Sequence, residues 1–273
     1  MIQARLLLLA ALTASIVSCR DRATDTPDRA HAPQDLGIQT DDGVRIASTL
    51  YPVTRQRAAG LVLVHALGSD RGSWSLFASR AQQAGYMCLA IDIRGHGESV
   101  MRHGERISYR TFNTTDWMAA LYDIRAAKTF LLEKGADPDN LAIVGASIGA
   151  NLALQYAVRD EDIQAVVMLS PGLEYKGVGT LDEIVAYGKR PSMLVTTKGD
   201  SYSASSCATL KAAAPGFCEL REYSGSAHGT DILAAFPLSV DQVLLWLESI
   251  IGPEAAAASR SREGETATPT ARP

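Results

Sequence analysis

Short apolar runs alternate with longer amphipathic segments through most of the chain, and this alternation constrains the possible folds more than any other feature. The runs and segments predict strands at 44–51, 61–65, 88–91, 141–144, 165–169, 193–196 and 218–223, and helices at 74–84, 116–134, 148–158 and 237–251. Strands buried on both faces that alternate with helices are typical of a mostly parallel sheet covered by helices on both sides. The sequence therefore predicts the α/β class.

The two ends of the chain differ in composition from the part between them. Residues 1–18 combine Arg5 with an apolar run too short to cross a membrane, which predicts a secretion signal peptide. Residues 19–34 are polar and contain two prolines, which indicates a flexible tether. Residues 253–273 contain three prolines and no large apolar side chain, so we expect a disordered tail. The folded domain is expected over residues 35–252.

The end of the expected signal peptide, Ile16-Val17-Ser18-Cys19, resembles a bacterial lipobox. In lipoproteins of that kind the cysteine is lipidated and becomes the new N-terminus, and two or more acyl chains suffice for stable anchoring. The sequence thus predicts an exported lipoprotein, held at a membrane of a bacterial envelope through Cys19. The alternative is an ordinary cleavage site beside an unrelated cysteine, which would give a soluble periplasmic or secreted protein.

Export into an oxidising compartment affects how the remaining cysteines are interpreted. Cys88 lies in an apolar run and is expected to be a buried, unreactive thiol. Cys207 and Cys218 have ten residues between them in a segment rich in small residues. We predict a disulfide between these two, with a pair of unpaired thiols as the alternative.

Charge and motif content exclude several classes of function. The formal net charge is −4, so the chain lacks the basic character that nucleic-acid binders need. The sequence has no Cys/His cluster with zinc-ligand spacing and no glycine-rich phosphate loop, so neither a metal nor a cofactor is expected.

The strongest local signal is Gly145-Ala146-Ser147-Ile148-Gly149, which lies between an expected strand and an expected helix. That context is the one that the nucleophile-elbow motif requires. The chain must reverse sharply there, so the serine takes a strained backbone conformation and projects its hydroxyl away from the sheet. Side chains at the two glycine positions would collide across the turn. The motif therefore predicts Ser147 as a nucleophile.

Two further motifs occur with this one in the order and spacing of the α/β-hydrolase family. His65-Ala66-Leu67-Gly68 resembles the family's His-Gly-x-Gly oxyanion loop, and residues 92–99 (Asp-Ile-Arg-Gly-His-Gly-Glu-Ser) resemble its Asp-x-Arg-Gly-His-Gly-x-Ser turn. The chain thus resembles an α/β hydrolase from Leu61 to about Ile251. Ala66 departs from the pattern, because the family commonly has glycine at that position.

The resemblance implies a Ser-His-Asp triad, two oxyanion-hole donors and no cofactor. By position, the donors are the backbone N–H groups of Leu67 and Ile148. The family order is nucleophile, acid, histidine, and His228 is the one histidine that follows Ser147 in the sequence. Asp200 follows the expected strand 193–196, where the acid should lie. The other candidates for the acid are Glu174, Asp182 and Asp231.

These residues predict a serine hydrolase that cleaves carboxylic esters of small molecules through an acyl-enzyme. Peptidase, thioesterase and amidase activities on the same triad are alternatives within catalysis. A non-catalytic surface lipoprotein that uses the fold for binding is the alternative from another class, and it would predict a damaged triad. Only about 20 residues, 171–191, separate two strands where many family members insert a lid. We therefore expect a minimal lid, an open site and a preference for short-chain, water-soluble esters.

Overall fold

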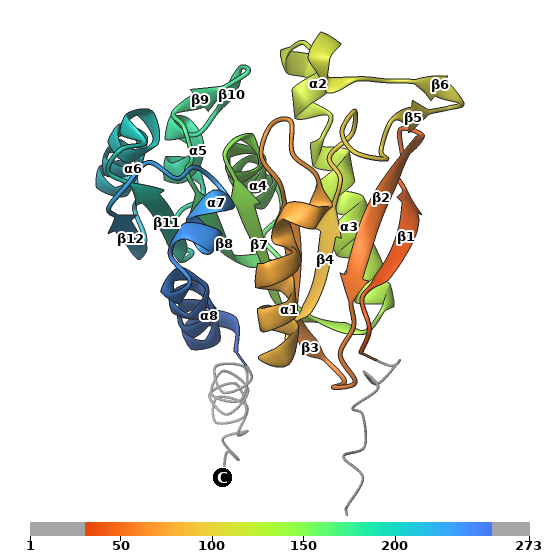
Figure 1. Ribbon diagram of the computed structural model, residues 1–273, viewed down its shortest axis with the longest axis horizontal. Helices are drawn as coiled ribbons and strands as arrows, with labels where there is room; N and C mark the ends of the chain where they lie inside the picture. The colour runs from red at the N-terminus through yellow and green to blue at the C-terminus, as the bar shows by residue number, and fades with distance from the viewer. Residues whose placement is uncertain (1–30, 253–273) are drawn as a thin grey trace, which may run out of the picture.

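A mostly parallel sheet runs through the middle of the structure, a computed structural model that describes residues 31–252 (Figure 1). The predicted signal peptide, Cys19, most of the predicted tether and the predicted tail lie outside the described residues. The parallel strands pair in the order β12-β11-β8-β7-β3-β4. Their bounds are β3 (Ala58–Val64), β4 (Met87–Ile91), β7 (Ala136–Ala146), β8 (Ile163–Leu169), β11 (Ser192–Thr197) and β12 (Cys218–Tyr223).

Antiparallel strands extend the sheet beyond β4. They are β1 (Gln34–Gln39), β2 (Val44–Tyr51), β5 (Met101–Arg102) and β6 (Glu105–Arg106). β2 pairs with β4, β1 and β5 both pair with β2, and β6 pairs with β5. β1 begins at the last residue of the predicted tether, because its ladder with β2 starts at the Gln34–Leu50 pair.

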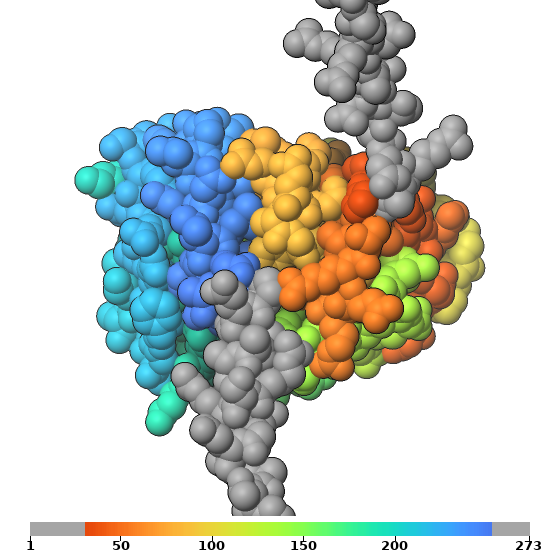
Figure 2. Space-filling view, turned by 90° about the horizontal axis from the view of Figure 1, so that it is seen from below, coloured from red at the N-terminus to blue at the C-terminus, as the bar shows by residue number. Residues whose placement is uncertain are grey.

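Helices cover both faces of the sheet. α3 (Leu121–Glu133), α4 (Ile148–Arg159) and α6 (Ser201–Ala213) contribute side chains to one buried cluster. α1 (Ser75–Gln83), α7 (Asp231–Ala235) and α8 (Leu238–Ile251) contribute to a second cluster on the opposite face. Figure 2 shows α8 in blue and α1 in light orange next to each other on the underside of the molecule. The result is the three-layer α/β-hydrolase fold.

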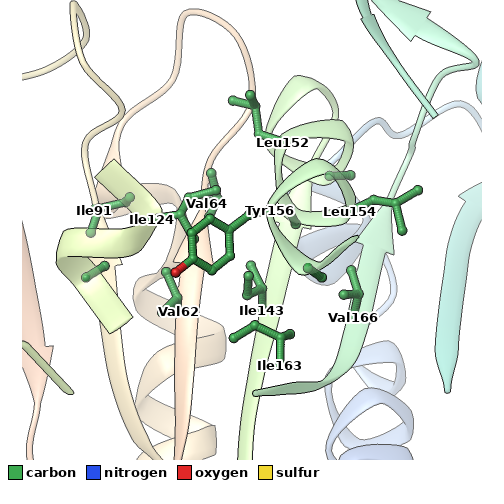
Figure 3. Packing of buried hydrophobic residues seen from close by; sticks show 14 of the residues in the cluster. Val62, Val64, Ile91, Ile124, Ile143, Leu152, Leu154, Tyr156, Ile163 and Val166 are labelled. Carbon is green, nitrogen blue, oxygen red and sulfur yellow. The ribbon is translucent and has the colours of Figure 1, made fainter. Parts of the chain in front are cut away.

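Successive residues of the central strands point alternately to one buried cluster and to the other. In β3, Val62 and Val64 belong to the cluster under α3 and α4, whereas Leu61 and Leu63 belong to the cluster under α1 and α8. Figure 3 shows the first of these clusters, where Tyr156 of α4 packs over strand side chains. A strand apolar on both faces is what a sheet between two helix layers requires, so the short apolar runs of the sequence are explained.

The helix predicted over 116–134 is interrupted. The chain forms α2 (Thr114–Met118) and then α3, and α2 begins with a capping box between Asn113 and Asp116. Around the junction the N–H groups of Ala120, Tyr122 and Asp123 donate to carbonyls three residues earlier, a tighter turn than that of an α-helix. In the first turn of α3, after this junction, the Asp123 carboxylate accepts from Arg94 Nε at 2.9 Å.

The disulfide predicted between Cys207 and Cys218 is wrong, because both residues are free thiols in the structure. The Cys207 thiol lies by the hydroxyl of Thr196, and the Cys218 thiol lies by the hydroxyl of Ser192. The ten-residue interval that suggested a bridge contains most of the second half of α6, a helix that the sequence analysis did not predict. Burial raises the pKa of both thiols.

No helix within residues 31–252 is both long enough and apolar enough to cross a membrane.

Candidate active site

Ser147 occupies the sharp turn between β7 and α4. Its backbone has φ 54° and ψ −123°, in the left-handed range that costs a non-glycine residue about 1–3 kcal/mol. A Cβ added at Gly145 would lie 2.3 Å from the Gly149 carbonyl oxygen, and one added at Gly149 would lie 2.4 Å from the carbonyl oxygens of Val64 and His65. Both glycines are therefore required by close backbone contacts, as the nucleophile-elbow motif predicts.

His228 and Asp200 lie beside this turn on neighbouring loops. Asp200 follows β11 at the start of α6, and its carboxylate makes no capping bond to that helix. His228 Nδ1 lies 2.6 Å from Asp200 Oδ2. Two hydrogen bonds hold the histidine loop: Thr197 Oγ1 donates to the Ala227 carbonyl at 2.8 Å, and the Gly229 N–H donates to Ser170 Oγ at 2.9 Å.

The charge of Asp200 is favoured by its surroundings. Burial alone would raise the pKa of Asp200, but hydrogen bonds from His228 and Ser203 outweigh it, and the pKa is lowered. The ionised carboxylate accepts a hydrogen bond from His228 Nδ1–H, which leaves Nε2 as the basic nitrogen of the ring. The Asp200 side chain is 14% exposed and that of His228 is 40% exposed, so the base is accessible while the acid is shielded.

No hydrogen bond joins Ser147 to His228 among the contacts within residues 31–252. Ser147 itself is buried, with 6% of its surface exposed. Hydrogen bonds between a nucleophile and its base are commonly long in the absence of substrate and shorten in the reacting complex. Among the described residues, no carboxylate of the other candidates for the acid, Glu174, Asp182 and Asp231, is hydrogen-bonded to the His228 ring; Asp231 contacts His228 through its backbone N–H, which donates to the His228 carbonyl at 3.2 Å.

The two proposed oxyanion donors belong to different segments of the chain. Ile148 is the first residue of α4, so its N–H has no acceptor within the helix and lies at the positive end of the helix dipole. Leu67 lies between Ala66 and Gly68, in a turn closed by the Ser69 N–H donating to the Ala66 carbonyl at 3.1 Å. Gly68 has a φ of 74°, whereas Ala66 does not have a positive φ. The side chain at Ala66 therefore imposes no left-handed strain on the loop.

His65 holds the oxyanion loop and takes no part in the triad. Its Nε2 accepts from the Ile93 N–H at 3.0 Å, and its Nδ1 lies 2.7 Å from the Ala66 carbonyl oxygen. Burial and the neighbouring His96 lower the pKa of His65 to about 3. A neutral ring that donates from Nδ1 and accepts at Nε2 satisfies both contacts.

The motif at 92–99 forms a structural turn, as the resemblance implied. Asp92 accepts from Arg71 Nη1 at 2.6 Å and from the Glu98 N–H at 2.8 Å. Arg94, which is 2% exposed, is held between the carboxylates of Asp42 and Asp123. Neither Arg94 nor His96 reaches the triad, and His96 stacks on Tyr109 with ring centroids 3.9 Å apart.

Two chain segments outside the central sheet border the candidate active site. The short insertion 171–191 contains a hairpin of β9 (Glu174–Tyr175) and β10 (Val178–Gly179), followed by α5 (Leu181–Ala186). The second segment, between β4 and α3, was not assigned to the site from the sequence. Its Tyr109 hydroxyl would lie 3.4 Å from a Cβ on Gly68. The lid is therefore small, but it has two parts.

Three polar residues near the triad were missed by the sequence analysis. Ser170, Tyr175 and Ser203 are hydrogen-bonded to one another at the end of β8. Ser170 has a φ of 50°, a conformation that no sequence motif marks. Within residues 31–252, no cluster of three or more His, Cys, Asp or Glu residues is arranged to hold a metal ion.

Comparison with known proteins agrees with this geometry. Residues 55–228, which include the whole span from β3 to the candidate base His228, match the family model described as serine aminopeptidase, S33. The chain belongs to this family. As an S33 family member it is an α/β hydrolase of the serine-hydrolase type. The family description names an aminopeptidase, and membership alone does not assign that activity to this chain.

The chain also resembles several individual proteins, at low sequence identity. The quorum-quenching protein AidA of Acinetobacter baumannii is 31% identical over 142 residues, which cover 51% of this chain and 44% of AidA. The chain thus spans about half the length of the curated relatives it matches. An esterase of Pyrococcus furiosus shares the fold with a TM-score of 0.65 and 17% identity, covering 81% of this chain and 92% of the esterase. A dienelactone hydrolase of Anabaena variabilis has a TM-score of 0.63 and 18% identity, covering 81% of this chain and all of the other.

Proposed function

We propose that this protein hydrolyses carboxylic esters through an acyl-enzyme, with Ser147 as nucleophile, His228 as base and Asp200 as acid. The observation that carries the proposal is a serine in a strained left-handed turn beside a His–Asp pair joined at 2.6 Å. Backbone strain of this kind persists where a side chain must be held in one position.

The steps follow from the positions of the groups. His228 Nε2 takes the Ser147 proton as Oγ attacks the ester carbonyl carbon, and the Leu67 and Ile148 N–H groups donate to the resulting oxyanion. His228 then gives the proton to the leaving alcohol. Water, deprotonated by His228, then attacks the acyl carbon. The bond from that carbon to Ser147 Oγ breaks, His228 returns its proton to Oγ, and the acid is released, while Asp200 remains ionised. Loss of one oxyanion donor costs about 2.7–4 kcal/mol in enzymes of this type.

Short-chain, water-soluble esters are the proposed substrates. The insertion 171–191 supplies only a hairpin of two two-residue strands and the six-residue α5, too little to form an apolar cap over a long acyl chain. His228 and Leu67 are both about 40% exposed at the opening. The names of the structural neighbours, an esterase and a dienelactone hydrolase, are consistent with ester substrates.

A substrate panel tests this proposal. The rates of hydrolysis of p-nitrophenyl acetate, butyrate and palmitate are compared with those of an aminoacyl p-nitroanilide and a thioester. The amide substrate is included because the family is described as serine aminopeptidases. We expect acetate or butyrate to be the best substrate. Fastest cleavage of the anilide would favour a peptidase, and fastest cleavage of palmitate would contradict the open site.

We also propose that the protein is exported and anchored by lipid on Cys19. The basis is the lipobox-like sequence Ile16-Val17-Ser18-Cys19. Cell fractionation with wild type and Cys19→Ser tests the location. The wild type should be in the membrane fraction with an acylated N-terminal cysteine, and the variant should be released or unprocessed. An intact mass that shows cleavage elsewhere and no acyl group would contradict this proposal.

A further inference from the structure

Ser170 is the residue after β8, and its polar groups are hydrogen-bonded to several different segments around the candidate active site. The residue is fully buried, and its backbone has a φ of 50°. Its N–H donates to the Val195 carbonyl of β11 at 2.7 Å, and its Oγ accepts from the Gly229 N–H at 2.9 Å. Its carbonyl accepts from Tyr175 O–H at 3.4 Å and from Ser203 O–H at 3.3 Å. Backbone strain of this kind persists where the surrounding structure fixes the conformation, and these bonds do so here.

The residue before Ser170 is hydrogen-bonded to the candidate nucleophile. The Ser147 N–H donates to the Leu169 carbonyl at 2.8 Å, directly after the last pair of the β7–β8 ladder, Ala146–Leu169. Figure 1 shows β7, β8 and β11 next to one another in the sheet. Two successive residues at the end of β8 therefore bind the backbone of the nucleophile and the loop of the base.

Gly229, which directly follows His228, is packed close to the turn of the nucleophile. It is buried and has a φ of 58°. A Cβ on Gly229 would lie 3.5 Å from the Cβ of Ala146 and 3.7 Å from the Cβ of Ala66. The backbone of the histidine loop is thus close to the nucleophile elbow on one side and to the oxyanion loop on the other. A shift of this backbone would move His228 relative to Ser147.

We propose that Ser170 is a positioning residue that sets the distance between the base and the nucleophile. Ser170 Oγ holds the Gly229 N–H, and the carbonyl immediately before Ser170 holds the Ser147 N–H. Both reacting side chains are therefore positioned from the same peptide unit, through one hydrogen bond each. This inference rests on the proposed function, because it concerns the transfer of the Ser147 proton to His228.

A second hydrogen bond holds the other side of the base and fixes a different distance. Thr197 Oγ1 donates to the Ala227 carbonyl at 2.8 Å, and Thr197 is the last residue of β11, the strand that Asp200 follows. That bond ties the histidine loop to the strand of the acid. The Ser170 bond ties the loop to β8, which pairs with the nucleophile's strand β7. Removal of the Ser170 hydroxyl should therefore disturb the approach of the base to the nucleophile and leave its pairing with Asp200 intact.

The test compares wild type, Ser170→Ala and Ser170→Gly in the hydrolysis of p-nitrophenyl butyrate and in stability against urea. Both variants lose the acceptor for the Gly229 N–H, but glycine adopts a φ of 50° without the steric cost that alanine retains. We therefore expect the glycine variant to be at least as stable as the alanine variant. In both variants kcat should fall by about 10- to 100-fold, since a misplacement of about 1 Å at a catalytic site can cost about 100-fold. KM should stay within about twofold of wild type, because Ser170 does not hold the substrate.

A His228→Ala background separates positioning of the base from a general effect on the site. If Ser170 acts through the base, adding Ser170→Ala to His228→Ala should change the residual rate of labelling by a fluorophosphonate by less than about twofold. Ser239→Ala is the matched control and should keep the wild-type kcat. Ser239 is a fully buried serine of α8 whose hydroxyl has no hydrogen-bond partner among residues 31–252.

The outcomes separate this inference from the proposed function. If wild type is active and Ser170→Ala has the same kcat, Ser170 does not position the base. A kcat that recovers in Ser170→Gly would also overturn the inference, because activity would then follow backbone strain and not the hydroxyl. A further loss in the His228→Ala background would overturn it too, since the hydroxyl would then act on something other than the base. A wild-type chain that neither hydrolyses the ester nor takes up the label would contradict the proposed function itself.

Discussion

The substitution Asp200→Asn removes one negative charge and almost no volume from the candidate active site. In the structure Asp200 Oδ2 lies 2.6 Å from His228 Nδ1, and the carboxylate is mostly shielded from solvent. An asparagine can present its amide N–H₂ to Nδ1. The imidazole would then carry its proton on Nε2, the nitrogen that must accept the proton of Ser147.

The expected loss is large because two effects act together. The wrong tautomer removes the base, and the missing charge no longer stabilises the imidazolium that forms during the reaction. The equivalent change in serine protease triads lowers kcat by about 10⁴-fold. That factor corresponds to about 5.5 kcal/mol in the activation free energy. We expect a loss of the same order here, since this His–Asp hydrogen bond is short and its acid is shielded.

The measurement is kcat on p-nitrophenyl butyrate, together with the circular dichroism spectrum to confirm folding. Asp231→Asn is the control: Asp231 is exposed at the start of α7, three residues from His228 in sequence, and should retain full activity. If Asp200→Asn keeps activity within about tenfold of wild type, the reasoning is refuted. The acid would then have to be sought at Glu174 or Asp182.

Two further substitutions test the scaffold around the site. Gly149→Ala should lower the free energy of unfolding by about 1–3 kcal/mol in urea titrations, because its Cβ would lie 2.4 Å from two backbone oxygens. Gly179→Ala, with its nearest neighbour at 3.7 Å, should cost much less, and equal losses would contradict the account. At Asp42, burial alone would raise the pKa, but hydrogen bonds from Arg94 and Thr40 lower it to about 2. A lowered pKa stabilises the fold above the ordinary value of 3.8 and ceases to do so as the pH falls towards 2. The difference in unfolding free energy between wild type and Asp42→Asn should therefore shrink over that interval, and a constant difference would refute this reading.

Local patterns in the sequence were sufficient to predict β2, the six parallel strands and the elbow, whereas β1 and the two-residue strands β5, β6, β9 and β10 were not predicted. The strands predicted at 44–51 and 218–223 coincide with β2 and β12, and Ser147 lies between β7 and α4 as expected. These features depend on residues close together in the chain, since burial of alternate side chains and collisions across a tight turn are local. They can therefore be read from a single sequence.

Features that depend on distant contacts could not be predicted. α6 is rich in Ser and Ala, and its helix is recognisable only from the packing of buried residues such as Leu210 beneath the sheet. The interruption between α2 and α3 lies next to Asp123, which binds Arg94, 29 positions earlier. Tyr175 reaches the triad only because the hairpin folds back over Gly172. None of these partners has a sequence signal of its own.

The central claim, that Ser147 is the nucleophile of a hydrolase, is tested most directly by mapping the site of a fluorophosphonate adduct. Purified full-length protein is incubated with the probe, digested, and the peptides are analysed by mass spectrometry. We predict one adduct, on Ser147, with labelling and ester hydrolysis both lost in a folded Ser147→Ala variant. An adduct on another residue, or ester hydrolysis that persists in Ser147→Ala, would contradict the claim.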